Sequence, residues 1–213
     1  MDDSVPAPMP IAGVILAGGR SARMGSPKAL LDFRGEPFVV RILEALEALD
    51  LKTRVVVVGP PPDGIRIRYA LQGHECLVVE NPDVEGGPIA SLRRALTALE
   101  LVRPPAVLCW PVDLPHVHVS TAERLVEAYR RGQHAITVPT FAGLRGHPVI
   151  WDQRLFEELR TSGAATREGA RAVLHAHEDD LQQVPVDDPA VTDVIHTPAD
   201  YERLIRDINR DAY

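Results

Sequence analysis

The stretch IAGVILAGGRSARMGSPKALL, residues 11–31, passes from an apolar run into glycines and then into cations. Its first part, residues 11–17, is short, continuous and apolar, which is typical of a strand buried on both faces of a sheet. Gly18 and Gly19 follow at once, and glycine permits backbone conformations and close approaches that side chains would prevent. The stretch therefore predicts a buried strand that ends in a loop open to a ligand.

The rest of the chain alternates between apolar runs and patterns of helical spacing. Further strands are expected at residues 53–59, 76–80, 106–110, 135–139 and 147–151. Helices are expected at residues 39–49, 89–101, 120–131, 152–160, 167–177 and 198–209. Ser120 is the expected N-cap of the third helix, and residues 59–64 are expected to form a turn or loop. Strands that alternate with helices predict an α/β fold, a Rossmann-like three-layer sandwich with a mainly parallel sheet and helices on both faces.

The composition is that of an ordinary globular protein, with 213 residues of which 45% are apolar. The formal net charge of -7 argues against a nucleic-acid partner, because such binders normally present a basic face. No apolar run approaches the roughly 20 residues that span a bilayer, so no membrane association is expected. Cys76 and Cys109 lie in apolar runs, which favours reduced thiols and a cytoplasmic location. We expect a flexible leader at residues 1–10 and a single domain at residues 11–213.

The loop after the first strand carries Arg20, Arg23 and Lys28 at the carboxyl end of that strand, where open α/β sheets bind ligands. It lacks the dinucleotide spacing G-x-G-x-x-G because Gly18 and Gly19 are adjacent, and the chain contains no Walker A string. Arginine offers a planar fork to phosphate oxygens, and lysine adds a mobile point charge. The alternative is a glycine turn with solvated cations, but the residue types favour a phosphate-binding loop.

Residues 16–39, LAGGRSARMGSPKALLDFRGEPFV, resemble the signature loop of the MobA-like nucleotidyltransferases. Members of that family make molybdenum-cofactor dinucleotides, and their relatives activate sugar phosphates. The resemblance implies that the loop binds a nucleotide, with residues 16–19 along the nucleobase and ribose, Arg23 on the triphosphate and Lys28 on the phosphates through the reaction. The nucleotide-binding residues implied in this loop are Leu16, Ala17, Gly18, Gly19, Arg20, Ser21, Arg23 and Lys28.

Three later segments resemble further motifs of the same family. Residues 81–96, NPDVEGGPIASLRRAL, resemble the second nucleotide-contacting segment, which implies contacts from Asn81, Gly87 and Ser91. Residues 111–117, PVDLPHV, resemble the family's metal loop. Residues 143–151, GLRGHPVIW, resemble the acceptor-side motif. The residues implied to bind the acceptor are Arg145, Gly146 and His147.

Asp113 is the predicted ligand of Mg²⁺ on two grounds. The resemblance assigns it that role, and it also follows an apolar strand at the same sheet edge as the glycine loop. Mg²⁺ takes one or two protein carboxylates and completes its octahedron with phosphates and water. The alternative is an aspartate that caps a turn before proline. For a second metal position the chain offers His196 where the family has Asp or Asn, and Asp193 is the substitute.

The resemblance implies a Mg²⁺-dependent enzyme in which an acceptor phosphate attacks the α-phosphorus of an NTP and pyrophosphate leaves. Arg23, Lys28 and Asp113 would carry the catalysis. Residues 145–149, 169–174 and 197–204 resemble the cytidylyltransferase branch, whereas LAGG at residues 16–19 resembles the guanylyltransferase branch.

The sequence leaves open which nucleotide and acceptor are used and whether the protein is catalytic. The C-terminal motifs favour CTP as the nucleotide and molybdopterin as the phosphorylated small-molecule acceptor. GTP-dependent guanylyl transfer and sugar-phosphate activation remain alternatives. A hypothesis of a different class is a nucleotide-binding chaperone or regulator that has no catalytic activity and acts on a molybdoenzyme partner. The simplest hypothesis is an α/β fold whose loop binds no particular ligand.

Overall fold

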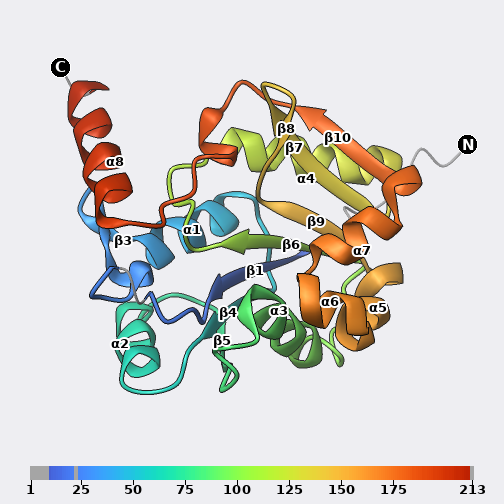
Figure 1. Cartoon of the computed structure of the whole chain (residues 1–213), viewed down its shortest axis with the longest axis horizontal. Helices are drawn as coiled ribbons and strands as arrows, with labels where there is room; N and C mark the ends of the chain where they lie inside the picture. The colour runs from blue at the N-terminus through green and yellow to red at the C-terminus, as the bar shows by residue number, and fades with distance from the viewer. Residues whose placement is uncertain (1–9, 22–23, 212–213) are drawn as a thin grey trace, which may run out of the picture.

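Strand β1 (Ala12–Ala17) lies in the middle of the sheet and pairs in parallel with β4 (Arg54–Val58) on one side and β6 (Ala106–Pro111) on the other (Figure 1). The computed structural model describes residues 10–21 and 24–211. The predicted leader at residues 1–10 therefore lies almost entirely outside the described residues. Alternate residues of these strands pack on opposite faces, so Val55 and Val57 join one core and Val56 and Val58 the other.

The sheet runs in the order β10-β7-β9-β6-β1-β4-β5, with β8 attached to β7. Its remaining strands are β5 (Leu77–Glu80), β7 (Ile136–Phe141), β8 (Leu144–Arg145), β9 (Val149–Asp152) and β10 (Leu181–Pro185). A separate hairpin joins β2 (Asp32–Phe33) to β3 (Glu36–Pro37). Strand β9 is antiparallel to both β6 and β7, so it begins at the edge where the parallel strands end.

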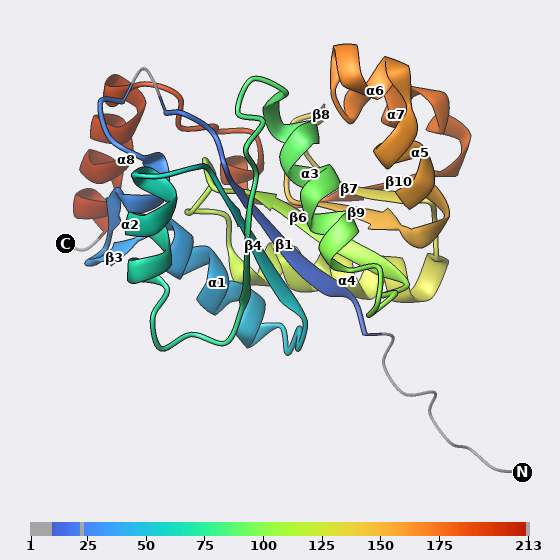
Figure 2. The ribbon, with the colours of Figure 1, turned by 90° about the horizontal axis from the view of Figure 1, so that it is seen from below.

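Helices cover both faces of the sheet (Figure 2). On one face lie α1 (Phe38–Ala48), α2 (Asp63–Ala70), α4 (Val119–Gly132) and α8 (Pro198–Asp211). On the other lie α3 (Gly87–Ala98), α5 (Phe156–Thr161), α6 (Gly163–Glu168) and α7 (Arg171–Ala176). Short 3-10 turns are η1 (Lys28–Leu30), η2 (Gln153–Leu155), η3 (Glu178–Asp180) and η4 (Pro189–Val191). The predicted α/β sandwich with a mainly parallel sheet is confirmed.

Some local predictions are wrong, each for a physical reason. The sequence predicts a loop where helix α2 begins. The helix gives no apolar pattern in the sequence, because only Gly64 and Ile67 are buried. Strand β10 was not predicted, because as an edge strand it buries only Val184. The helix expected at residues 167–177 is divided at Gly169, whose positive φ of 74° ends α6.

The N-cap predicted at Ser120 is also wrong. Helix α4 begins at Val119, and its N-cap residue is His118, whose own side chain makes no capping bond. The carboxylate of Asp188 satisfies polar groups at this helix start instead. It accepts hydrogen bonds from the backbone N–H of His118 at 3.0 Å and from the hydroxyl of Thr121 at 2.7 Å. The cap therefore comes from a segment about 70 residues away in the chain, which no local pattern could indicate.

The outer edge of β5 is protected by two arginines. Arg68 on α2 donates to the carbonyl of Val78 at 3.1 Å, and Arg94 on α3 donates to the carbonyl of Glu80 at 3.1 Å. Unpaired carbonyls on an edge strand invite another strand to pair with them. One guanidinium from each helical layer thus occupies the acceptors that a foreign strand would use.

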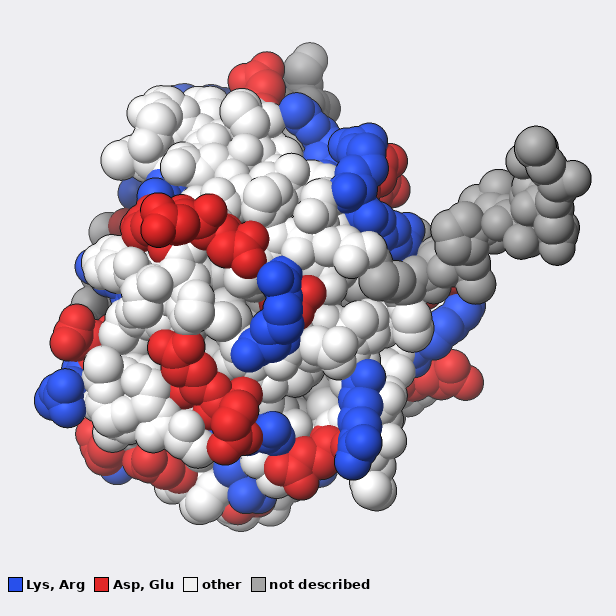
Figure 3. Space-filling view, turned by 90° about the vertical axis from the view of Figure 1, so that its right-hand side faces the viewer, with Lys and Arg blue, Asp and Glu red and all other residues white. Residues whose placement is uncertain are grey.

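The surface carries charges of both signs. On the face in Figure 3, lysine and arginine side chains lie among aspartates and glutamates with uncharged surface between them. None of the described helices has the length and apolar character needed to cross a membrane.

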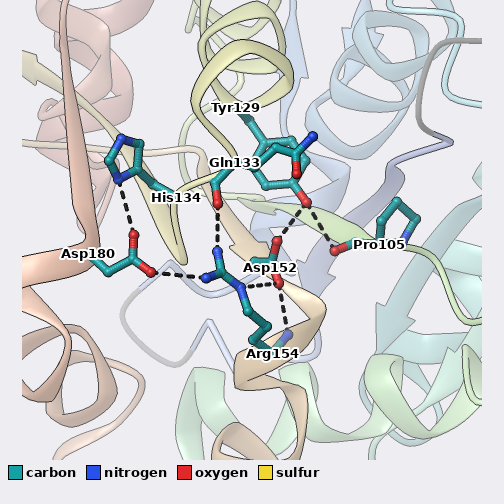
Figure 4. A network of polar contacts seen from close by, with 7 residues as sticks. All are labelled: Pro105, Tyr129, Gln133, His134, Asp152, Arg154 and Asp180. Atoms are coloured by element: carbon teal, nitrogen blue, oxygen red, sulfur yellow. Dashed lines mark hydrogen bonds and ion pairs between the residues drawn. The ribbon is translucent and has the colours of Figure 1, made fainter. Parts of the chain in front are cut away.

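A polar network ties β9 and η3 to α4 at the sheet edge opposite the carboxyl ends of the parallel strands (Figure 4). The hydroxyl of Tyr129 lies 2.8 Å from Asp152 Oδ2 and 3.1 Å from the carbonyl oxygen of Pro105. Arg154 bridges Asp152 and Asp180. Burial raises the pKa of Tyr129, and its hydrogen bond to Asp152 adds to the shift, so the phenol remains the hydrogen-bond donor.

We expect Tyr129→Phe to lower the free energy of unfolding by about 1–3 kcal/mol, because Asp152 would lose a donor while staying buried. Urea denaturation measures this difference. Tyr69→Phe is the matched control, since the Tyr69 side chain is 74% exposed and should lose nothing. Equal stability of the two variants would contradict a structural role for the network.

Candidate active site

A cavity of about 480 Å³ opens at the edge where β1, β4, β5 and β6 end. Its walls come from the segments that follow those four strands, which the parallel pairing brings to one place. The lining residues used below are Leu16, Ala17, Gly18, Gly19, Arg20, Ser21, Lys28, Gly87, Ser91 and Asp113. The site is thus assembled from segments that lie as much as 97 residues apart, from Leu16 to Asp113.

The glycine loop folds back so that Ser21 holds Lys28. Ser21 has a positive φ of 48°, and its hydroxyl accepts the backbone N–H of Lys28 at 2.9 Å. The carbonyl of Ser21 also accepts the N–H of Met24 at 2.8 Å. Lys28 then starts η1 and points its ammonium at the cavity. Arg23, predicted to bind the triphosphate, lies outside the described residues.

Lys28 and Asp113 form an ion pair at the wall of the cavity, with Nζ 2.9 Å from Oδ2. Both side chains are largely buried, being 12% and 25% exposed, so the pair is less screened by water than a surface pair. The backbone of Ile195 donates to the carbonyl of Asp113 at 3.0 Å and ties this corner to the C-terminal segment. A cation and a carboxylate therefore lie side by side at the wall of the cavity.

The candidate second metal ligand is His196 rather than Asp193. His196 Nδ1 lies 3.9 Å from Asp113 Oδ2, whereas Asp193 pairs with Arg203 at 2.5 Å and lies 3.4 Å from His116. Within the part of the chain that the structure describes, no three His, Cys, Asp or Glu side chains gather around a point that could hold a metal. Asp113 fits a Mg²⁺ ion that takes its other ligands from phosphates and water.

Asn81 and Ser91 form a buried pair behind the cavity wall. Asn81 is 1% exposed, does not line the cavity, and donates from Nδ2 to Ser91 Oγ at 3.1 Å. A Cβ on Gly18 would lie 2.8 Å from the same oxygen, so glycine is needed for the first loop to pass over Ser91. Gly87, with φ 68°, begins α3 nearby. The structure thus brings Ser91 to the cavity and keeps Asn81 behind it.

At the mouth of the cavity, Arg20 pairs with Glu85 at 2.6 Å, and both side chains are exposed. The bond connects the loop after β1 with the loop before α3. Because exposed ion pairs are weak, it leaves Arg20 available to a phosphate.

A second cavity of about 490 Å³ adjoins the first and shares Leu16 and Pro88 with it. Its floor is apolar and comes mainly from the sheet and α3: Leu92, Cys109, Val138, Val149 and Trp151. Its polar groups come from β8, the loop before β9, α6 and α7: Arg145, His147, Glu168, Arg171 and His175. The arrangement suits a molecule with an apolar body and an anionic group.

Gly146 is required by packing against η4. A Cβ there would lie 2.4 Å from the carbonyl oxygen of Val191, and the N–H of His147 donates to that same oxygen at 2.9 Å. His147 is thereby held against the second cavity, where its Nδ1 is buried and has no hydrogen-bond partner among the described residues. Burial lowers the pKa of His147, and the charge of Asp113 opposes the shift. The imidazole is therefore neutral near pH 7.

Arg145 lies at the edge of the second cavity in a two-bond ion pair with Glu178, whose oxygens are each 2.6 Å from a guanidinium nitrogen. The hydrogen bonds from Arg145 lower the pKa of Glu178. Both side chains are partly exposed, so the pair can exchange partners with an incoming anion.

Comparison with known proteins identifies the family. Residues 13–181 match the model of the MobA-like NTP transferase domain. The chain belongs to this family. Curated relatives in this family are named as nucleotidyltransferases, and the chain spans 56%, 64% and 58% of the length of three that it matches.

Two curated relatives illustrate the range of the family. A molybdenum cofactor guanylyltransferase of Burkholderia orbicola (strain MC0-3) is 34% identical over 74% of this chain and 74% of its own. A 2-C-methyl-D-erythritol 4-phosphate cytidylyltransferase of Streptomyces avermitilis is also 34% identical, over 63% of this chain and 56% of its own. The match therefore spans little more than half the length of that relative.

Among solved structures, Rv0371c from Mycobacterium tuberculosis H37Rv superimposes with a TM-score of 0.78 and 29% identity, covering 94% of this chain and 99% of that one. The same protein has also been solved as a complex with manganese, with a TM-score of 0.73, 27% identity, and coverage of 92% and 98%. The fold of the MobA-like protein thus matches that of its relative over nearly the whole chain.

The structure brings most of the predicted residues to the two cavities. The described loop residues, Gly87, Ser91 and Asp113 line the first, and Arg145, Gly146 and His147 line the second. Asn81 lies behind the wall, and His196 is exposed beside Asp113. Arg171 and His175 were not predicted as site residues, although the motif at residues 169–174 marked the segment that holds Arg171. Their roles remain predictions.

We expect Gly146→Ala to lower the free energy of unfolding by about 1–3 kcal/mol, because the new methyl group must displace the buried backbone at Val191. Thermal and urea unfolding measure this loss. Gly163→Ala on α6 is the matched control: its Cβ would meet only Arg167, at 3.7 Å, and stability should be unchanged or slightly higher. A stable Gly146→Ala variant would refute the packing requirement.

Proposed function

We propose that the protein transfers a nucleoside monophosphate from an NTP to a phosphate-bearing small molecule and releases pyrophosphate. The observation that carries this proposal is the pair of adjoining cavities that share Leu16 and Pro88. One has the Lys28–Asp113 pair at its wall, and the other has an apolar floor with cationic groups. The reacting phosphates would meet where the two cavities join.

In this proposal Lys28 and Arg23 would neutralise the triphosphate, and the carboxylate of Asp113 would hold Mg²⁺. Lys28 already lies 2.9 Å from Asp113, so it exchanges a carboxylate partner for a phosphate when the nucleotide binds. The metal would supply charge neutralisation at the α-phosphate and the leaving pyrophosphate. The manganese complex of the Mycobacterium relative supports a divalent ion in this family.

No general base is required of the protein. The acceptor phosphate is already an anionic nucleophile, so the side chains have only to align it with the α-phosphorus and stabilise the growing charge. His147 is buried and kept neutral, which suits a hydrogen-bond donor or acceptor to the acceptor molecule better than a charged contact.

The acceptor would bind in the second cavity. The guanidinium groups of Arg145 and Arg171 would form bidentate hydrogen bonds with its phosphate, and the apolar floor would pack against its body. The ring face of a flat heteroaromatic body such as a pterin would pack on that floor with its polar edge turned away, whereas the hydroxyls of a sugar would remain without partners there. Molybdopterin is therefore the favoured acceptor, and a sugar phosphate is the alternative.

CTP is the favoured nucleotide. The motifs at residues 145–149, 169–174 and 197–204 support the cytidylyl assignment, and the structure places the first two at the second cavity. Curated relatives include both cytidylyltransferases and guanylyltransferases, so GTP is the alternative that must be tested directly.

Thermal unfolding with CTP, GTP, UTP and ATP, each with and without Mg²⁺, tests the nucleotide. A ligand present at about 100 times its Kd adds roughly 2.7 kcal/mol of stability, which gives a clear rise in Tm. We expect the largest Mg²⁺-dependent rise with CTP. A rise with GTP alone would replace CTP, and no rise with any nucleotide would refute the proposed function.

We expect Asp113→Asn to reduce Mg²⁺-dependent nucleotidyl transfer by at least about 100-fold with little change in Tm, because the amide keeps the shape and loses the charge that holds the metal. Release of pyrophosphate reports the turnover. Asp193→Asn is the matched control, since Asp193 faces Arg203 and not the cavity. Near-normal turnover by Asp113→Asn would remove Asp113 from the mechanism.

A further inference from the structure

Three short helices, α5, α6 and α7, follow one another along the chain, and the last two reach the second cavity. Each is six residues long and buries a single residue: Leu159, Ala165 and Val173 respectively. Helices this short gain little stability from their own hydrogen bonds and depend on tertiary contacts. Arg171 and His175, one turn apart on α7, line the cavity. Their position therefore depends on what fixes the three helices to the rest of the fold.

Arg93 on α3 binds the junction between α5 and α6. Its Nε donates to the carbonyl of Leu159 at 3.0 Å, and its Nη2 donates to the carbonyl of Ser162 at 2.9 Å. These two nitrogens lie on one edge of the planar guanidinium, so the bonds fix the orientation of the junction as well as its distance. Leu159 belongs to the last turn of α5, where carbonyls lack a partner within the helix. Arg93 therefore supplies donors that α5 itself does not have.

Ser162 extends this anchorage to α6. Its hydroxyl accepts the backbone N–H of Ala165 at 3.2 Å, which makes Ser162 the N-cap of α6. Its carbonyl is the one that Arg93 binds. Gly169 ends α6, and α7 begins two residues later at Arg171. The contact with Arg93 thus lies at the start of the segment that places Arg171.

The guanidinium of Arg171 is positioned by the backbone of α7. Arg171 makes no hydrogen bond or ion pair within the described part of the chain, whereas Arg145 is held by two bonds to Glu178. Helix α3 lies beside α5 and α6 (Figures 1 and 2). It contributes Ser91 to the first cavity and Leu92 to the second. The helix that holds the three short helices therefore borders both cavities.

We propose that Arg93 is a positioning residue for the acceptor phosphate, because it fixes α5, α6 and α7 on α3 so that Arg171 faces the second cavity. This inference rests on the proposed nucleotidyl transfer to a phosphate-bearing acceptor. Arg93 lines neither cavity, so it acts through Arg171 and does not touch the substrate. Loss of its two bonds would leave the apolar floor in place and weaken only the binding of the anionic group.

Two probes separate the anionic group from the apolar body. 1-Naphthyl phosphate has both, and 1-naphthol has the same body without the phosphate. Calorimetry on the full-length protein gives the Kd of each, and the Kd of 1-naphthol divided by that of 1-naphthyl phosphate measures what the phosphate contributes. Arg171→Ala should lower this ratio by about 10-fold or more, as expected for a hydrogen bond between charged groups. Such a loss assigns the phosphate of the probe to the second cavity.

Arg93→Ala should lower the same ratio by about 5-fold or more and leave the Kd of 1-naphthol nearly unchanged. Arg94→Ala is the matched control and should not move the ratio. It removes the same charge from the same helix, but Arg94 binds the carbonyl of Glu80 at the edge of β5. When Arg171→Ala is already present, adding Arg93→Ala should lower the ratio no further, because Arg93 acts through Arg171.

Arg93→Lys tests whether the planar group is needed. Lysine keeps the charge and most of the packing, but a single ammonium cannot bind both carbonyls along one edge. We expect this variant to lower the ratio as well, and Arg94→Lys to leave it unchanged. If Arg93→Ala does not fold, this second pair of variants decides the proposal.

The outcomes separate the inference from the function on which it rests. If the unmodified protein binds no nucleotide with Mg²⁺, the proposed function fails. If it binds a nucleotide but the Arg93 variants leave the ratio at the value of their Arg94 controls, the inference fails while the function stands. Equal weakening of both probes would show a purely structural role for Arg93 and would also overturn the inference. A further fall of the ratio in the double variant would do the same.

Discussion

Parallel pairing of β1 with its two neighbours is the constraint on which the site depends. Strands that run in the same direction end at the same edge, so the segments after β1, β4, β5 and β6 must share a small volume. The helices that return the chain between them pack on both faces and bury most of β1, β4 and β6. The Lys28–Asp113 pair is a product of this topology, because its members are 85 residues apart in the chain.

Features that follow from local chemistry were predictable from the sequence. Continuous apolar runs such as residues 53–59 indicate buried parallel strands, and the glycine–cation loop after β1 indicates a site for an anion. Asp113 could be assigned to the same edge because it too follows an apolar strand. The predictions of the strands and of their common edge are confirmed because short stretches of the chain determine burial and strand direction, whereas the anion site stays a prediction.

Features that depend on distant partners were not predictable. Asp188, in another segment, caps the start of α4, so the prediction of Ser120 as the N-cap is wrong. Helix α2 and strand β10 bury too few apolar residues to produce a pattern. The bond from Asn81 to Ser91 on α3 keeps Asn81 behind the cavity wall, and its contact with a nucleotide stays a prediction. In each case the deciding contact is made by tertiary structure and leaves no periodic signal.

The reversal of β9 has a consequence for how such a protein can diversify. All residues of the first cavity precede residue 114, whereas most of the second comes from residues 138–175, on a loop, an inverted strand and two short helices. The network around Asp152 and Asp180 fixes this stretch at the opposite edge of the sheet (Figure 4). Most of the lining of the second cavity can therefore change within one contiguous stretch of the chain while the lining of the first stays as it is.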